Sequence, residues 1–361
     1  MTQKNAIILR IALRTGVFLL AIGVLIREAS CNRHSTIPPA AVKAASQAAP
    51  FHTYILFAFD TNCTLTLWGD EKVTSEAASS AIQLLNRLHA TLNHYDEDSE
   101  LAHFNAAPTN TPFPCSDLLW QAFTSAQKAY RQTDGVFDVT VGPLMSFWKQ
   151  AAAKPEQPPS PEKLAEAQNR VGFGKLVLDE QTHTVTKTVA DMSVDFGGLT
   201  KGLALDLVQP LLTQAGITRM MLDFGGNLYL ENPDELPNAG EVQIRDPRAG
   251  DHSTGKMLGA LTDANHRCIA TSANSERPIA TGKRSIGHIM NPWTGMPADT
   301  LEQVTAVTPR GVDSDVFSTA VFIAGPDLAR KLAEQCPETG FILLPHDDIP
   351  QAVGSATLKT E

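Results

Sequence analysis

The sequence predicts an α+β domain in which mixed sheets pack against helices. Segments whose apolar residues alternate with polar ones, as in strands, are interspersed irregularly with segments whose apolar residues recur every three or four positions, as in helices. The regular strand–helix alternation of a parallel sheet is missing. With 43% apolar and 19% charged residues, the 361-residue chain can bury a sizeable core.

The first part of the domain is expected to pair strands and then form two helices. Residues 54–68 predict a strand pair or one long bent strand, because apolar residues and threonines alternate in this stretch. Helical spacing of apolar residues predicts helices over residues 75–92 and 118–131. The polar residues 95–100 between them predict a loop.

The second part continues the mixture of short strands and helices, and no interior linker divides it. We expect, in order, a helix over residues 161–170 beginning on Ser160, a hairpin of 176–179 with 184–186, a helix over 202–215, strands at 220–222 and 227–230, and helices at 315–324 and 327–335. Gly216 directly follows the helix expected over residues 202–215 and is a typical residue at a helix end. The chain beyond the N-terminal region therefore reads as one domain.

The N-terminus has the pattern of an export signal. Lys4, Arg10 and Arg14 precede an apolar run over residues 16–26. About twenty apolar residues are needed to span a bilayer, so this run better fits the apolar region of a secretory signal. An uncleaved membrane anchor and a buried core helix are the alternative interpretations.

Cys31 follows small residues directly after this run, which resembles a bacterial lipobox with a lipidated cysteine, although Glu28 stands where an aliphatic residue is usual. We therefore expect residues 1–31 to be a signal peptide or membrane anchor carrying the lipidation site. Residues 32–52, rich in Ala, Pro, Ser and Gln, are expected to form a flexible tether. The folded domain is then expected over residues 53–361, exported to the periplasmic face of a bacterial inner membrane.

Charge and cysteine usage exclude several classes of function. The net charge of −10 argues against a nucleic-acid partner, since phosphate binding needs a basic surface. No two cysteines have the CxxC spacing of a zinc site or a redox pair. Pairing is open for an exported chain, and buried free thiols are expected for most of the remaining cysteines, which are Cys63, Cys115, Cys268 and Cys336.

Three clusters of residues can carry chemistry. In the first, Asp195 precedes paired glycines, Lys201 and a predicted helix, which suits an anionic ligand because glycines allow close approach and a helix start favours phosphate. In the second, His288 precedes an Asn-Pro turn and can act as a base. In the third, Asp315 and Thr319 are four residues apart, so that a helix would place both oxygens on one face, as Mg²⁺ requires. Each cluster alone also fits an ordinary structural role.

Taken together and in this order, the motifs closely resemble the FAD:protein FMN transferases, the ApbE family. The resemblance covers residues 58–325. The motifs that carry it are residues 137–144 (FDVTVGPL), 195–206 (DFGGLTKGLALD), 223–227 (DFGGN), 288–295 (HIMNPWTG) and 315–319 (DVFST). Membership implies a single ApbE-like domain related to the T-fold.

The resemblance also implies roles for individual residues. Asp195 and Lys201 would contact FAD, and His288 would be the base that activates the acceptor. The flavin and adenosine pocket would be lined by Phe59, Tyr95, Val136, Phe137 and Asp138. Mg²⁺, with Mn²⁺ as the alternative, would be held by Gly198, Asp315, Ser318 and Thr319.

The implied reaction is Mg²⁺-dependent transfer of FMN from FAD to a Ser or Thr hydroxyl of a client flavoprotein, with release of AMP. Respiratory or ion-pumping flavoproteins are the expected clients. The alternatives are a periplasmic FAD pyrophosphatase that gives FMN and AMP, and a lipoprotein that binds flavin without catalysis or is purely structural.

Two departures from the family pattern lie near the expected flavin. The family usually has Met-Gly-Thr where this chain has Phe59-Asp60-Thr61, so that Asp60 adds charge and bulk. It usually has Thr-Ser-Gly where Ala273 ends the triplet here, and alanine disfavours positive φ. We expect both changes to affect FAD affinity and to leave the phosphate and metal elements intact.

Overall fold

The computed structural model describes residues 50–154, 156, 159–231, 240–249, 256–262, 264–274, 279–281, 284–346 and 348–360. The predicted signal, Cys31 and all but the last residues of the tether lie outside this part of the chain and stay predictions. Within it, no helix is both long enough and apolar enough to cross a bilayer.

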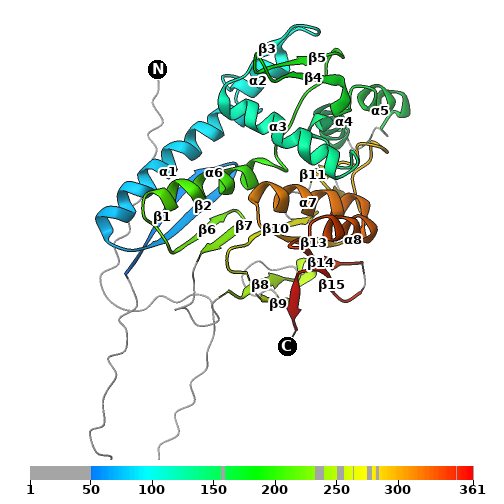
Figure 1. Ribbon diagram of the computed structural model, residues 1–361. Coiled ribbons are helices and arrows are strands. Elements are labelled where there is room, and N and C mark those ends of the chain that lie inside the picture. Colours follow the sequence, from blue (N-terminus) through cyan, green and yellow to red (C-terminus); the bar gives the residue numbers. More distant parts are fainter. Residues whose placement is uncertain are drawn as a thin grey trace, which may run out of the picture.

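An eight-stranded sheet forms the centre of the molecule (Figure 1). Every neighbouring pair in it is antiparallel. In spatial order its strands are β1 (Phe51–Ala58), β2 (Thr61–Trp68), β6 (Met220–Phe224), β7 (Asn227–Glu231), β10 (Cys268–Ala273), β13 (Gln303–Thr308), β14 (Gly340–Leu344) and β15 (Gln351–Gly354).

Helices cover one face of this sheet, and a small sheet packs on the other. The covering helices are α1 (Glu71–Leu92), α6 (Thr200–Gln214), α7 (Gly311–Ala324) and α8 (Pro326–Gln335). The small sheet has the order β16 (Thr357–Lys359), β9 (Met257–Thr262), β8 (Val242–Arg245). The remaining elements are α2 (Glu100–Ala106), α3 (Asp117–Gln132), α4 (Gly142–Ala152), α5 (Pro161–Gln168), the strands β3 (Phe113–Pro114), β4 (Leu176–Asp179), β5 (Thr184–Lys187), β11 (Ile279–Thr281) and β12 (Arg284–Ile286), and 3₁₀ turns at Val139–Val141, Phe173–Lys175 and Pro247–Ala249.

Strand alternation divides the core into two clusters. Phe341 and Leu343 of β14 point to the helices and join the main cluster, whereas Ile342 between them joins a second cluster with Ile244 and Leu261 of the small sheet. Both faces of β14 are thus buried, which is why this strand is a continuous apolar run.

The predicted α+β architecture is confirmed, with differences at the element ends. Residues 54–68 form a strand pair, not one bent strand, and β1 begins at Phe51, two residues inside the predicted tether. The predicted loop over residues 95–100 ends where α2 begins, because the Ser99 hydroxyl caps that helix by accepting from Ala102 N. The helices predicted to start at residues 202 and 315 start at Thr200 and Gly311.

Candidate active site

A cavity of about 750 Å³ opens between the β1–β2 turn, the start of α6, the α7 helix and the loop after β12. Residues from distant parts of the chain line it. All but one of the residues predicted for FAD, metal and catalysis are among them, namely Phe59, Tyr95, Val136, Phe137, Asp138, Asp195, Gly198, Lys201, His288, Asp315 and Thr319. Only Ser318 of the predicted set is not part of this lining.

The loop before α6 carries the predicted anion-binding residues. Asp195 Oδ1 accepts a hydrogen bond from Gly197 N at 2.8 Å, and His94 Nδ1 lies 3.5 Å from the same oxygen. A Cβ on Gly198 would come within 3.2 Å of the Phe137 ring, so glycine allows the loop to pass against the aromatic wall. The start of α6 and the Lys201 ammonium bring positive charge to this part of the cavity, beside the carboxylates of Asp195 and Asp315.

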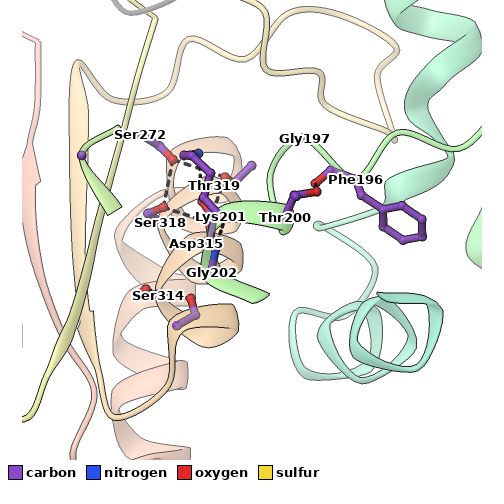
Figure 2. A network of polar contacts seen from close by, with 12 residues as sticks. Phe196, Gly197, Thr200, Lys201, Gly202, Ser272, Ser314, Asp315, Ser318 and Thr319 are labelled. Atoms are coloured by element: carbon purple, nitrogen blue, oxygen red, sulfur yellow. Dashed lines mark hydrogen bonds and ion pairs between the residues drawn. The ribbon is translucent and has the colours of Figure 1, made fainter. Parts of the chain in front are cut away.

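Asp315 is the central carboxylate of the site (Figure 2). Its Oδ2 accepts from Gly202 N at 2.9 Å, and its Oδ1 lies 3.5 Å from Lys201 Nζ. The residue is only 4% exposed. A buried carboxylate needs a cation or several hydrogen-bond donors beside it. Here α6 supplies the Lys201 ammonium as the cation and Gly202 N as a donor.

Three hydroxyl groups, of Ser272, Ser318 and Thr319, form a hydrogen-bonded group beside Asp315 (Figure 2). Ser272 Oγ lies 2.9 Å from Ser318 Oγ and 3.2 Å from Thr319 Oγ1. Ser318 and Thr319 each donate to the Asp315 carbonyl. Ser318 is fully buried and linked to Ser272 and the α7 backbone, so its place is behind the cavity wall, whereas Thr319 lies on the wall.

The donor set is compatible with a hard cation. Asp315 and Thr319 offer a carboxylate and a hydroxyl on one face of α7, and Gly198 lies beside Thr319. Mg²⁺ typically takes one or two carboxylates and completes its shell with water and substrate phosphate oxygens. Among the described residues, no group of three or more His, Cys, Asp or Glu side chains is arranged so that it could hold a metal ion by itself.

Aromatic residues form another part of the cavity lining and adjoin the Asp195 loop through His94. Tyr95 is 61% exposed, its ring centre lies 3.9 Å from that of His94, and its hydroxyl accepts from Lys149 Nζ at 2.6 Å. Phe59 packs edge-on against His89, whose Nδ1 accepts from Phe59 N at 3.2 Å. Such rings can stack on planar heterocycles.

Asp138 lines the cavity, but its carboxylate oxygens are engaged in hydrogen bonds within the protein. Its oxygens accept from Thr140 N, Thr140 Oγ1 and Phe173 N at 2.6–2.8 Å. Burial raises the pKa of this carboxyl above its ordinary value, and the hydrogen bonds oppose that shift. Asp138 therefore shapes the aromatic wall formed by its neighbours Val136 and Phe137.

His288 lies half-buried on the cavity wall beside Ile289 and Met290. The turn that follows it is held from two sides. Asn291 Oδ1 accepts from Trp293 N at 2.9 Å, and Trp148 Nε1 of α4 donates to the Gly295 carbonyl at 2.8 Å. This fixed turn keeps the imidazole at the cavity.

Asp206 positions α7 relative to α6. Its Oδ1 accepts from Gly311 N at 2.6 Å and its Oδ2 from Val312 N at 3.2 Å, so the carboxylate caps the start of α7. Burial raises the pKa of Asp206, opposed by these backbone donors. Because Asp315 lies one turn after this cap, Asp206 sets where the central carboxylate stands.

Comparison with known proteins agrees with this geometry. A profile of the ApbE family matches residues 59–343. The chain belongs to the ApbE family. The FAD:protein FMN transferase of Haemophilus influenzae is 30% identical to it over 274 residues, which cover 74% of this chain and 78% of that protein. The FAD:protein FMN transferase of Escherichia coli K12 is 28% identical over 272 residues, covering 74% and 76%.

Solved structures of the ApbE family share the fold. The flavin transferase ApbE from Vibrio cholerae superposes with a TM-score of 0.71 at 24% identity, covering 85% of this chain and 98% of that chain. The ApbE protein from Thermotoga maritima gives a TM-score of 0.73 at 21% identity, covering 84% and 97%. The predicted ApbE-like domain is thereby confirmed.

The two departures from the ApbE family pattern have different structural outcomes. Phe59 and Asp60 form the β1–β2 turn with φ of 54° and 58°, a left-handed conformation that glycine would adopt without cost. Ala273 lies in β10 opposite Gln303, in extended backbone outside the positive-φ region. The backbone strain expected at Ala273 is therefore absent, and positive φ occurs at Phe59 and Asp60 instead. The expected effect of both changes on FAD affinity stays a prediction.

Residues that the sequence did not single out complete the ApbE site. His94 and Lys149 flank Tyr95, and Ser272 joins α7 to β10. His94 directly precedes the predicted residue Tyr95, and Ser272 lies in the Thr-Ser-Ala triplet, so the sequence could have indicated both as site residues. It could not indicate Lys149, because this residue reaches the cavity from α4, a helix that the sequence analysis did not predict.

Proposed function

We propose that this chain transfers FMN from FAD to a Ser or Thr hydroxyl of client proteins and releases AMP. The observation that carries the proposal is one cavity, in a chain of the ApbE family, that joins a buried carboxylate–hydroxyl face and a lysine to an aromatic end. FAD has groups that suit both parts of this cavity, because it carries a charged pyrophosphate between two planar heterocycles. The relatives in Haemophilus influenzae and Escherichia coli are named FAD:protein FMN transferases, which supports the transfer of FMN from FAD to a protein.

The chain's residues divide the work of binding and transfer. Asp315, Thr319 and the Gly198 carbonyl are the groups that would hold Mg²⁺ or Mn²⁺, which when bound neutralises pyrophosphate charge and stabilises the phosphoryl-transfer transition state. Lys201 and the start of α6 place further positive charge at the phosphates. Tyr95, with the aromatic wall opposite, orients the flavin and adenine rings.

In the proposed reaction, a client hydroxyl oxygen bonds to the FMN phosphorus of FAD while the bond from that phosphorus to the AMP oxygen breaks. His288 accepts the hydroxyl proton, and AMP leaves. No nucleophile of this chain is needed. Water in place of the hydroxyl would give FMN and AMP, so the balance between transfer and hydrolysis depends on which acceptor reaches His288.

We further propose that the chain works outside the cytoplasm, lipid-anchored through Cys31 at the periplasmic face of the inner membrane, on respiratory or ion-pumping flavoproteins. The basic residues, apolar run and cysteine of residues 1–31 support this proposal. Mass spectrometry of the mature protein's N-terminal peptide tests it. The peptide should begin at Cys31 and carry a lipid on its thiol, and a chain that retains residues 1–30 with an unmodified Cys31 would contradict lipid anchoring.

Mass spectrometry tests the transfer itself. A flavin-free client from a respiratory flavoprotein is incubated with FAD, Mg²⁺ and the purified chain. The client should gain the mass of one FMN less one water on a single Ser or Thr peptide. AMP release at the same rate with and without the client, and no mass gain, would instead identify a hydrolase. Bound FAD that stays intact would identify a flavin-binding protein.

A further inference from the structure

Large apolar side chains are exposed along β1, which is one edge of the eight-stranded sheet (Figure 1). Phe51, Ile55 and Phe57 are 59%, 56% and 70% exposed. Side chains alternate along a strand, so these three project from the same face. Among the strands that the structure describes, β1 pairs only with β2, and its other side has no strand partner.

This edge lacks the features by which edge strands normally avoid new partners. β1 and β2 contain no Lys, Arg, Asp, Glu or Pro. Their pairing runs without a bulge from Phe51 opposite Trp68 to Ala58 opposite Thr61. A long, regular, apolar edge is a template for the addition of another strand.

The same strand leads into the candidate active site. Ala58 ends β1, and Phe59 and Asp60, which follow it, both line the cavity. Phe57 precedes Phe59 by two residues, so their Cα atoms are at most about 7 Å apart. A segment bound along β1 would therefore pass from Phe57 to the cavity within a few residues.

We propose that β1 is the docking strand for the client protein. An extended client segment adds to the free edge through main-chain hydrogen bonds, and its apolar side chains pair with Ile55 and Phe57. The segment then carries its Ser or Thr past Phe59 into the cavity. This inference rests on the proposed function, because it requires a polypeptide as the acceptor.

The chemistry of the edge favours a polypeptide over a lipid surface. Attachment to an anionic bilayer normally combines apolar side chains with Lys or Arg, and neither strand supplies one. Arg219 lies 4.9 Å from the Trp68 ring, but at the Phe51 end of the hairpin, which is the end opposite the cavity.

The test compares a double variant, Ile55→Lys with Phe57→Lys, against the single variant Ile349→Lys. Ile349 is 73% exposed and lies beside β15 at the other edge of the same sheet, which makes it a matched control. The probe is the client that the wild-type chain labels by mass spectrometry. We expect the double variant to raise the KM for this client about ten-fold or more, with the Kd for FAD and the release of AMP to water unchanged. The control should match wild type.

Each other outcome has a separate meaning. If wild type labels no client, the proposed function fails. If wild type labels the client and the double variant does so with an unchanged KM, the docking inference is overturned and the function stands. Loss of FAD binding in the double variant would assign β1 a structural role and also overturn the inference.

Two further measurements identify a different occupant. With an unchanged client KM, loss of sedimentation with phosphatidylglycerol vesicles would identify a lipid surface, and a lower mass in light scattering would identify a second copy of the chain. Either result overturns the inference. Hydrogen exchange with wild type provides an independent check, since β1 amides should gain protection when the client binds, and unchanged exchange there would contradict the inference.

Discussion

Gly202 of α6 and Gly311 of α7 meet where the two helices cross, and neither position has room for a side chain. A Cβ on Gly202 would overlap the Gly311 carbonyl and lie 2.8 Å from the Asp315 Cβ. A Cβ on Gly311 would overlap the Gly202 carbonyl and lie 2.8 Å from the Leu205 Cβ. This close approach allows Gly202 N to donate to Asp315, so the two glycines help to set the position of the central carboxylate.

Gly311→Ala should destabilise the protein and impair the site together. The added methyl group meets backbone, which cannot move aside, so we expect a loss of about 1–3 kcal/mol in the free energy of unfolding. FMN transfer should fall as α7 shifts. Gly174→Ala is the control, because a Cβ there would meet nothing within 4 Å. Urea unfolding of both variants checks this, and equal stabilities would contradict the helix-crossing argument.

Asp315→Asn should remove transfer while leaving the fold intact. An asparagine oxygen can still accept from Gly202 N, but the charge that attracts a divalent cation is lost, and we expect transfer to fall by about 100-fold or more. Asp313→Asn is the matched control, since Asp313 is on the same helix and lies 4.0 Å from Lys128, outside the cavity. FMN labelling is measured against Mg²⁺ concentration. Normal labelling by Asp315→Asn would contradict the metal assignment.

The candidate site was predictable where its residues are close in sequence. Asp315 and Thr319 were placed on one helix face by their spacing of four, and α7 confirms that spacing. The contacts of Asp206 with Gly311 and of Ser272 with Thr319 join residues 105 and 47 positions apart. No periodicity connects such pairs, because helix crossing and strand order decide which of them meet.

The fold was predictable where an element has one buried face. The apolar stripe of α1 predicted that helix, but its true start at Glu71 depends on Asp70, whose carboxylate accepts from Lys72 N and Val73 N. β14 has no alternation because both of its faces are buried, and the sequence analysis missed it. α4 was also missed, although Pro143 in its first turn is a typical helix-start signal.

His288→Ala should slow the chemical step more than it weakens FAD binding. A general base contributes about 100- to 10,000-fold, so the rate of FMN transfer at saturating FAD should fall within that range. His103→Ala is the control, because His103 is exposed on α2 and does not line the cavity. FAD binding is measured separately by fluorescence. Loss of FAD binding with no further effect on the rate would show that the imidazole binds FAD and does not act as a base.

Cys63, Cys115 and Cys268 should be unreactive in the folded protein. The structure shows Cys63, Cys115, Cys268 and Cys336 as free thiols, as the sequence led us to expect for most of them. Burial raises the pKa of Cys63 and of Cys115 to about 12, and burial also raises that of Cys268. The thiolate is the reactive form, so iodoacetamide at mildly alkaline pH should modify these three only after unfolding. Peptide mapping checks this, and disulfide-linked peptides would contradict it.

Asp60→Gly should stabilise the protein, and comparison with Asp60→Asn separates backbone conformation from charge. Glycine adopts the φ of 58° freely, so its substitution should add about 1 kcal/mol to the free energy of unfolding. Asparagine tolerates the left-handed region much as aspartate does, so Asp60→Asn should leave stability nearly unchanged. Both variants remove a negative charge from the lining of the cavity into which FAD would bring its own negative charge. Both should therefore bind FAD more tightly, and calorimetry would contradict this argument if only Asp60→Gly did so.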